Sequence, residues 1–358
     1  MDIMAILTQA INEGTIPFLI RQTLIYAVPL MIVALAGVFS ERSGVINLAL
    51  EGIMIFGAFV GVLFVRLVQQ WGWFEAAYTA KNWMTLQGFA LMTMCVSAVL
   101  GAAFAMLLAF AAINLKADQT IGGTALNLMA PALVLFFVRI LANQNTLQMF
   151  KGDSAGWFML KESLFGFGVG RGVNKTPSMG FFGQVFINKV YPMTYVCILI
   201  FIILAIILYK TKFGLRLRAC GEHPQAADSV GVNVYKIRYA GVLISGALGG
   251  IGGMAYIIPS VSSWNFEVGV SGAGFLALAV MIFGQWKPFR IFFAAVFFAL
   301  FKSLANIASS IPAMAALGWT QNMYNMIPFI ASMIILAFTS KKSRAPKAEG
   351  IPYDKGSR

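Results

Sequence analysis

The feature that most constrains this chain is a series of apolar intervals without charged side chains. A helix needs about 20 apolar residues to cross roughly 30 Å of hydrocarbon. The clearest intervals of this size are Gln22–Ser40, Asn82–Leu115, Gln119–Val138 and Val190–Tyr209. Further spans are predicted in Tyr239–Phe266 before a turn at Pro259, in Phe289–Ser309, and in Ser303–Ser340 after an interruption at Pro312. The chain is therefore predicted to be an all-α, polytopic transmembrane helical bundle.

Composition excludes several other classes. Of the 358 residues, 59% are hydrophobic and 11% are charged, too few charges to cover a soluble core of this apolar content. The formal net charge is +13, but the basic residues lie between the apolar intervals, which is typical of membrane topology and not of a nucleic-acid-binding face. The three cysteines, Cys95, Cys197 and Cys220, are far apart, so no disulfide framework or metal site is predicted.

Two shorter segments are predicted to be broken or partly inserted helices. Val45–Val65 contains the acidic Glu51, and Gly272–Gly284 lies between glycine-rich ends. Interrupted helices in membranes occur where backbone lines a cavity or is buried in protein. With these two, the total is about nine membrane segments.

The Lys and Arg residues of the loops predict the orientation. Lys210–Arg238 has six basic and two acidic residues, the turn Lys287–Arg290 adds two basic residues, and the tail from Lys341 has six basic against two acidic. All three are expected in the cytoplasm. The predicted divisions are an N-terminal segment (1–20), a first repeat (21–142), an extracytoplasmic loop (143–189), a connecting helix (190–209), a cytoplasmic loop (210–238), a second repeat (239–340) and a basic cytoplasmic tail (341–358).

An internal repeat supports this division. Ser43–Leu50 (SGVINLAL) resembles Ser271–Leu278 (SGAGFLAL), and Met54–Gly57 echoes Met281–Gly284. Each copy follows one apolar span and precedes two more. Two four-segment units joined by one span have opposite orientations. Inverted repeats of this kind typically build transporters, whose interrupted helices point N-terminal N–H groups at the substrate.

Glu51 is the first candidate for a functional residue. An acid inside an apolar segment costs roughly 2.5 kcal/mol or more unless it faces a polar cavity or a partner. Asn47, four residues earlier, is expected on the same helix face, where the two would line a polar patch. The alternative is a local capping role or a pair with Arg42. Lys302 is a second charge within a span, and we interpret it as a structural residue that extends toward an interface.

Enzymatic functions are not supported. The sequence Gly269-Val270-Ser271-Gly272 has the form used by intramembrane serine proteases, but the lone histidine, His223, lies in the cytoplasmic loop. The glycine-rich run Ser245–Gly253 lies inside a span, where small residues let helices approach closely. No phosphate-binding G-x-x-x-x-G-K-[ST] loop occurs, so any ATP hydrolysis belongs to another chain.

The cytoplasmic loop holds a predicted short helix. Pro224 suits the first turn of a helix and Gly231 suits its C-terminal stop. Ala226, Ala227 and Val230 are expected to form a small apolar pad, which would fit a groove on a soluble partner.

At these residues the chain resembles the permease subunits of ATP-binding-cassette importers in the branched-chain amino acid, ribose and nucleoside group. Gly214–Ala227, followed by Gly231–Val234, looks like the coupling loop of that family, and the resemblance covers roughly Leu24–Thr339. Phe39–Gly52 is most similar to one of the two paired permeases of nucleoside systems. Gly272–Leu278 and Ile282–Trp286 are similar to its second pathway segment.

The resemblance implies a permease in a bacterial cytoplasmic membrane that takes up nucleosides. It would pair with a second, non-identical permease, bind ATP-hydrolysing subunits and receive substrate from an extracytoplasmic binding protein. ATP would bind the partner, and the chain itself would need no cofactor or metal. Simple sugars, branched-chain amino acids and a vitamin such as riboflavin remain open as substrates. An ion-gradient-driven secondary transporter is the alternative from another class.

Two sets of site residues follow. The predicted substrate pathway is Ser43, Gly44, Asn47, Glu51, Ser271, Gly272, Gly274 and Phe275. The residues predicted to couple to the ATPase are Gly221, Glu222, Pro224, Ala226, Ala227 and Gly231. The loop 143–189 is longer than the family pattern. Its aromatic residues are expected either to dock the binding protein or to lie at the membrane interface: Trp157, Phe158, Phe165, Phe167, Phe181 and Phe182.

Overall fold

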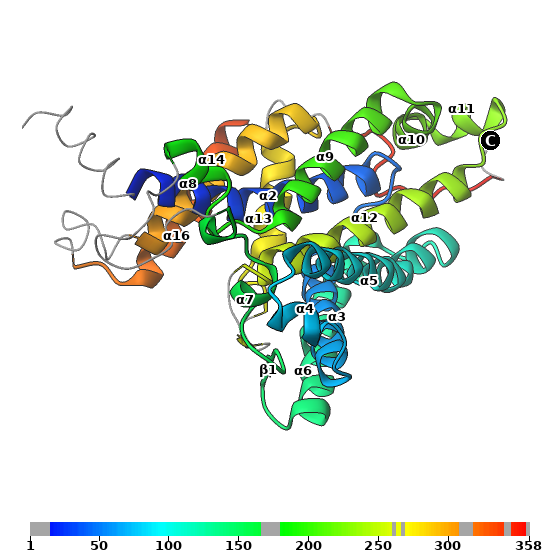
Figure 1. Ribbon diagram of the computed structural model, residues 1–358. Coiled ribbons are helices and arrows are strands. Elements are labelled where there is room, and N and C mark those ends of the chain that lie inside the picture. The colour runs from blue at the N-terminus through cyan, green and yellow to red at the C-terminus, as the bar shows by residue number, and fades with distance from the viewer. Residues whose placement is uncertain are drawn as a thin grey trace, which may run out of the picture.

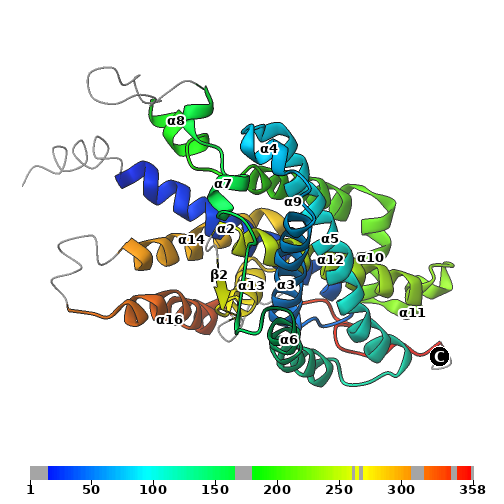
Figure 2. The same ribbon diagram turned by 60° about the horizontal axis from the view of Figure 1, so that its bottom comes forward.

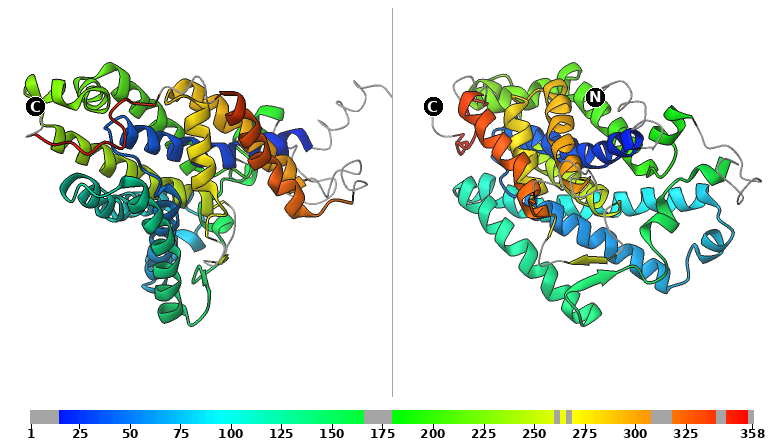
Figure 3. Two further views of the ribbon diagram at one scale, coloured as in Figure 1. Left: turned by 180° about the vertical axis from the view of Figure 1, so that it is seen from behind. Right: turned by 90° about the vertical axis from the view of Figure 1, so that its left-hand side faces the viewer.

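The structure, a computed structural model, describes residues 15–165, 180–259, 263–265, 269–307, 318–339 and 345–355, and these are mostly helical (Figure 1). Within these ranges, seven helices are long and apolar enough to cross a membrane. They are α2 (Thr15–Glu41), α3 (Leu50–Gln70), α5 (Trp83–Ala109, continued by the π-helix η1, Phe110–Asn114), α6 (Gln119–Ala142), α9 (Pro192–Lys210), α12 (Val234–Ile257) and α14 (Pro288–Ile307). Two further apolar helices are α13 (Ala273–Phe283) and α16 (Gln321–Thr339), which packs against α13 and α14 (Figure 3).

The all-α membrane fold is confirmed, whereas the total of about nine membrane segments and the inverted repeat remain predictions. The turn at Pro312 lies outside the described residues. The divisions of the chain stay predictions as well, but α2 begins at Thr15, before the predicted span Gln22–Ser40 and across the predicted division between residues 20 and 21. Arg21 fits inside this helix because its guanidinium donates hydrogen bonds to the carbonyls of Gln184 (3.5 Å) and Asn188 (3.3 Å).

Helix α12 lies at the centre of the bundle and packs against α2, α3 and α5. The glycine-rich run allows this close approach, as predicted. A Cβ on Gly246 would lie 2.8 Å from the Gly101 carbonyl oxygen of α5, and a Cβ on Gly250 would collide with the Ser97 carbonyl oxygen. Helix α3 lies beside both α5 and α6 (Figure 2). Small residues thus place four helix backbones close together.

Short elements gather at one end of the bundle. They are α4 (Glu75–Thr79), β1 (Thr146–Gln148), α7 (Ser154–Phe158), the 3₁₀ helix η2 (Glu162–Phe165), α8 (Phe181–Phe186) and β2 (Ser263–Asn265). Strands β1 and β2 pair antiparallel, with Leu147 opposite Trp264. This small ladder links the predicted loop 143–189 to the second half of the chain.

The opposite end carries α10 (Lys212–Glu222), α11 (Pro224–Ser229) and the last described residues, 345–355 (Figure 1). The predicted loop 210–238 is therefore largely helical. Its last five residues already belong to α12, which begins at Val234. Arg238 lies in that helix and is buried, not in a solvated loop.

Candidate functional site

Glu51 joins α3 to the short helix α13. It lies in the first turn of α3, and its carboxylate accepts hydrogen bonds from backbone N–H groups at the start of α13. Oε1 accepts from Gly272 at 3.0 Å, and Oε2 accepts from Gly274 at 2.6 Å. The first N–H groups of a helix lack internal partners and carry the positive end of the helix dipole, so a carboxylate there is stabilised. Glu51 therefore caps α13 from another helix.

Glycine allows this contact. A Cβ on Gly274 would lie 2.5 Å from the Cα of Glu51, closer than any real side chain permits. The preceding turn has left-handed backbone at Ser271 (φ 55°) and Gly272 (φ 74°). Ser271 and Phe275 remain exposed at the surface of the chain beside this junction.

The chain between α2 and α3 is irregular, and side chains satisfy its backbone. Gln119 Oε1 accepts from the N–H of Ile46 at 2.7 Å. The amide of Asn127 on α6 accepts from the N–H of Gly52 at 2.8 Å and donates to the Leu48 carbonyl at 2.6 Å. Non-helical backbone inside a membrane requires such partners. The residues before Leu50 are therefore irregular, whereas α3 itself runs unbroken from Leu50 to Gln70, so a broken helix over Val45–Val65 is not confirmed.

Ser43, Gly44 and Asn47 lie in this irregular segment, and the structure gives them partners within the protein. Asn47 precedes α3, so the prediction that it shares a helix face with Glu51 is wrong. Asn47 Nδ2 donates to Ser245 Oγ of α12 at 2.8 Å, and its Oδ1 accepts from the N–H of Ala49 at 3.1 Å. Ser43 Oγ donates to the Ser40 carbonyl at 2.6 Å. A Cβ on Gly44 would lie 2.8 Å from the buried Arg238 guanidinium.

The alternative pairing of Glu51 with Arg42 is also wrong. Arg42 forms an ion pair of 3.2 Å with Glu222 at the end of α10. The residue that follows α2 and the last residue of α10 are therefore in direct contact.

Lys302 has specific partners within the bundle. Its ammonium donates to Tyr256 Oη at 2.8 Å and lies 5.7 Å from the centre of the Tyr26 ring. One turn further along α14, Asn306 Nδ2 donates to Tyr26 Oη at 2.7 Å. Among the described residues no carboxylate lies within ion-pair distance of Lys302. The tyrosines escaped the sequence analysis because isolated aromatic residues in apolar spans carry no pattern.

Helix α11 has the predicted form, with Pro224 at its first position and a left-handed Gly231 just after it. The predicted apolar pad is wrong in part. Ala226 is exposed and Val230 is 77% exposed, but Ala227 packs in a buried cluster with Cys220, Val234 and Tyr353. Ala227 faces inward because α11 packs against α10 and α12, and Ala227 lies on the side of α11 that meets them.

A cleft of about 460 Å³ opens at the α4 and α7 end of the molecule. Its lining includes three lysines and three large aromatic residues: Lys81, Lys151, Lys161, Tyr78, Trp83 and Trp157. Trp157 is buried and stacks on Tyr78 with ring centres 4.5 Å apart.

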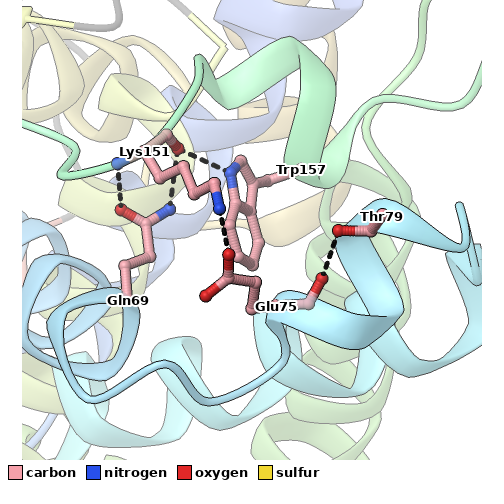
Figure 4. A network of polar contacts seen from close by, with 5 residues as sticks. All are labelled: Gln69, Glu75, Thr79, Lys151 and Trp157. Atoms are coloured by element: carbon pink, nitrogen blue, oxygen red, sulfur yellow. Dashed lines mark hydrogen bonds and ion pairs between the residues drawn. The ribbon is translucent and has the colours of Figure 1, made fainter.

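Figure 4 shows how one wall of the cleft is held. Gln69, at the end of α3, accepts from the N–H of Lys151 at 3.2 Å, while Trp157 donates to the Lys151 carbonyl at 2.7 Å. The Lys151 ammonium pairs with Glu75, and Thr79 donates to the Glu75 carbonyl at 3.0 Å. These contacts fix the backbone of residue 151 from two sides.

The other loop aromatics divide into two groups. Phe158 is buried with Trp157, whereas Phe165, Phe181 and Phe182 are exposed. Phe167 lies outside the described residues. Buried rings serve packing, and the exposed ones are open to an interface.

No group of three His, Cys, Asp or Glu side chains suited to a metal ion occurs within the described ranges. Cys220 is buried, and burial raises the pKa of its thiol to about 11, so it stays protonated at neutral pH.

Seven apolar helices of the described residues are long enough to span a membrane, and a buried carboxylate joins α3 to α13; these features define a polytopic membrane protein. The chain belongs to the family described as branched-chain amino acid transport system / permease component, whose model matches residues 19–337. The description makes the members of this family permease components of transport systems.

Individual relatives are similar over most of the chain. The nucleoside ABC transporter permease protein NupC of Lactococcus lactis is 37% identical over 96% of this chain and 98% of its own. The guanosine ABC transporter permease protein NupQ of Bacillus subtilis is 38% identical over the whole of both chains. The putative glucose ABC transporter permease protein TsgC13 of Haloferax volcanii is 31% identical over 80% of this chain and 76% of its own. No solved structure matches the chain.

Proposed function

We propose that this chain is a membrane-spanning subunit of an ATP-driven importer for nucleosides in a bacterial cytoplasmic membrane. The observation that carries the proposal is similarity at 37% and 38% identity, over nearly full length, to two permeases named for nucleoside and guanosine transport. The glucose relative is more distant and covers less of both chains. Nucleosides are therefore favoured over simple sugars.

The solute pathway is proposed to pass the junction of α3 and α13. Ser271 and Phe275 are exposed there, beside the Glu51 cap. Lys302, Asn306 and the two tyrosines offer donors, acceptors and ring faces from three helices. A nucleoside needs such groups because its ribose hydroxyls and base must exchange water for other hydrogen-bond partners.

Coupling to ATP hydrolysis is assigned to α10 and α11, on the cytoplasmic side. Ala226 and Val230 are exposed on α11, which suits a knob in the groove of an ATPase subunit. Gly221 and Glu222 lie behind it, where Glu222 pairs with Arg42. ATP-driven movement of the partner would press on α11 and tilt the attached helices, opening the pathway inward. A second, non-identical permease would complete the membrane part.

The cleft at the α4 and α7 end would then face the outside. Lys151 is already paired with Glu75, but Lys81, Lys161 and the exposed neighbouring aromatics suit the docking of an acidic surface on an extracytoplasmic binding protein. The side chains of Gln69 and Trp157 would hold that surface in place before docking.

Uptake of a radiolabelled nucleoside by cells that lack this chain, and by cells with it restored, tests the proposal. We expect uptake to be lost and then recovered, and to depend on ATP. Unchanged uptake without the chain would contradict the substrate. Uptake that stops with an ionophore while ATP is maintained would favour a gradient-driven secondary transporter.

A further inference from the structure

The end of the chain is folded against the bundle. Residues 345–355 belong to the predicted cytoplasmic tail. They lie at the end of the bundle that carries α10 and α11, close to the C label in Figure 1. The N–H of Ala348 donates to the Gly221 carbonyl at 2.8 Å, and Arg238 Nη1 donates to the Ile351 carbonyl at 3.0 Å. Lys116, just after η1, pairs with Asp354 at 2.9 Å. The segment thus touches α10, α12 and the end of η1 within a few residues.

The same segment contacts the irregular chain between α2 and α3. A Cβ on Gly350 would lie 2.8 Å from the Cδ1 atom of Ile46, which precedes α3. The neighbouring Glu349 is partly buried against the end of α2. Its carboxyl group lies beside the carboxyl group of Glu41 and near Arg42. Glu41 in turn accepts a hydrogen bond from the indole of Trp286, just beyond α13.

An aromatic anchor completes the contact. Tyr353 is 5% exposed and packs with Cys220 of α10, Ala227 of α11 and Val234 of α12. Its ring meets that of Tyr235 edge to face, with ring centres 5.3 Å apart. Burial of a Tyr ring contributes more to such a contact than the exposed ion pair of Lys116 and Asp354.

We propose that residues 345–355 are a tie that fixes α10 and α11 to the end of α2 and to the broken segment before α3, so that movement of α11 reaches the pathway. This proposal rests on the proposed function, which makes α11 the element that the ATPase moves. It adds the segment that transmits the movement. Without the tie, α10 and α11 would remain joined to the bundle by α9, α12 and the Arg42 to Glu222 ion pair.

The tie is expected to respond to pH. Burial raises the pKa of Glu349 to about 7. The charged and titratable groups that act on it are Glu41 of α2 and Arg42; beyond them, Arg42 pairs with Glu222 of α10, and Arg238 of α12 donates to the Ile351 carbonyl. Two carboxyl groups in contact share a proton. When the tie is released, Glu349 is in water and its pKa returns to the ordinary value of 4.5. Docking of the tie is therefore strongest below pH 4.5, weakens as the pH rises from 4.5 to about 7, and changes little above that.

The first test measures docking without transport. Cys220 has 0% exposure and is covered in part by Tyr353, so release of the tie should expose its thiol. In the full-length protein carrying Cys95→Ser, maleimide labelling of Cys220 is followed at several pH values. Glu349→Gln should label more slowly than the unsubstituted chain at pH 7, and the difference should shrink as the pH falls toward 4.5, the ordinary pKa of this carboxyl group. Lys355→Gln, an exposed change in the same segment, is the control. Equal labelling of Glu349→Gln and the unsubstituted chain at every pH would overturn the pH response.

The second test measures coupling in the reconstituted complex of permeases, ATPase and binding protein. Removing residues 345–358 should leave ATP hydrolysis and lower nucleoside uptake per ATP by roughly tenfold, the change that a coupling free energy of about 1.4 kcal/mol gives. If this truncated chain does not assemble, Tyr353→Ala replaces it. Uptake per ATP equal to that of the full chain would overturn the tie.

The two failures are distinguishable. If the unsubstituted complex takes up no nucleoside, the proposed function fails, while the labelling of Cys220 still reports whether the tie docks. If the complex takes up nucleoside and neither truncation nor Tyr353→Ala changes uptake per ATP, only the tie fails.

Discussion

Replacing Glu51 by Ala should destabilise the junction of α3 and α13 more than any exposed charge change. The substitution removes both acceptors and leaves the N–H groups of Gly272 and Gly274 without partners in a buried site. A charge-assisted hydrogen bond contributes about 1.5–3 kcal/mol in soluble proteins. Interhelical bonds in membranes contribute about 0.6–2 kcal/mol. For two bonds we expect a loss of roughly 2–4 kcal/mol.

The stability of Glu51→Gln should lie between that of the unsubstituted chain and that of Glu51→Ala. Its amide keeps one oxygen acceptor but presents a nitrogen donor to the other N–H group. The assay is the unfolding midpoint of the purified protein in a titration with a denaturing detergent. Glu75→Gln is the matched control, because Glu75 is half-exposed and pairs with Lys151 at the surface, where such pairs contribute about 0–1 kcal/mol. A midpoint shift for Glu51→Ala no larger than that of Glu75→Gln would refute the cap. Unchanged uptake and substrate profile in Glu51→Ala would return this residue to a purely structural role.

Three further predictions concern packing, coupling and the pathway. Gly250→Ala should lower stability by about 1–3 kcal/mol, because its Cβ meets the carbonyl of Ser97, whereas Gly88→Ala has open space and should not; equal unfolding midpoints would contradict the packing. Ala226→Glu should abolish coupled uptake with the fold intact, because Ala226 is exposed. Ala227→Glu should also lower stability, because Ala227 is buried. Normal uptake in Ala226→Glu would count against α11 as the coupling element. Lys302→Gln should raise the KM for nucleoside roughly tenfold, the effect of losing one charged hydrogen bond, and an unchanged KM would leave this lysine structural.

The fold was largely predictable because spanning helices leave a simple signal. Charge-free apolar length fixed the positions of α5, α6 and α9. The start of α2 was missed because Arg21 interrupts the apolar interval, and its partners lie more than 160 residues away in the chain. Such long-range satisfaction of a charge has no local signature.

The site was predictable by position and not by partner. An acid in an apolar segment identified Glu51, and the repeat pointed to Gly272 and Gly274, but nothing in the sequence paired them. Asn47 was placed on a helix face because residues 43–50 were treated as helical. Side chains of α6, which supply the hydrogen bonds of that segment, allow it to be irregular. The packed tail was missed since its composition is that of a solvated end.

The most direct test of the central claim is uptake of radiolabelled guanosine into proteoliposomes that hold this chain with its co-purified partners, with and without ATP inside and with binding protein outside. The account predicts uptake that requires ATP, binding protein and this chain, and that persists when an ionophore removes ion gradients. Uptake by this chain alone, driven by a gradient and indifferent to ATP, would contradict it.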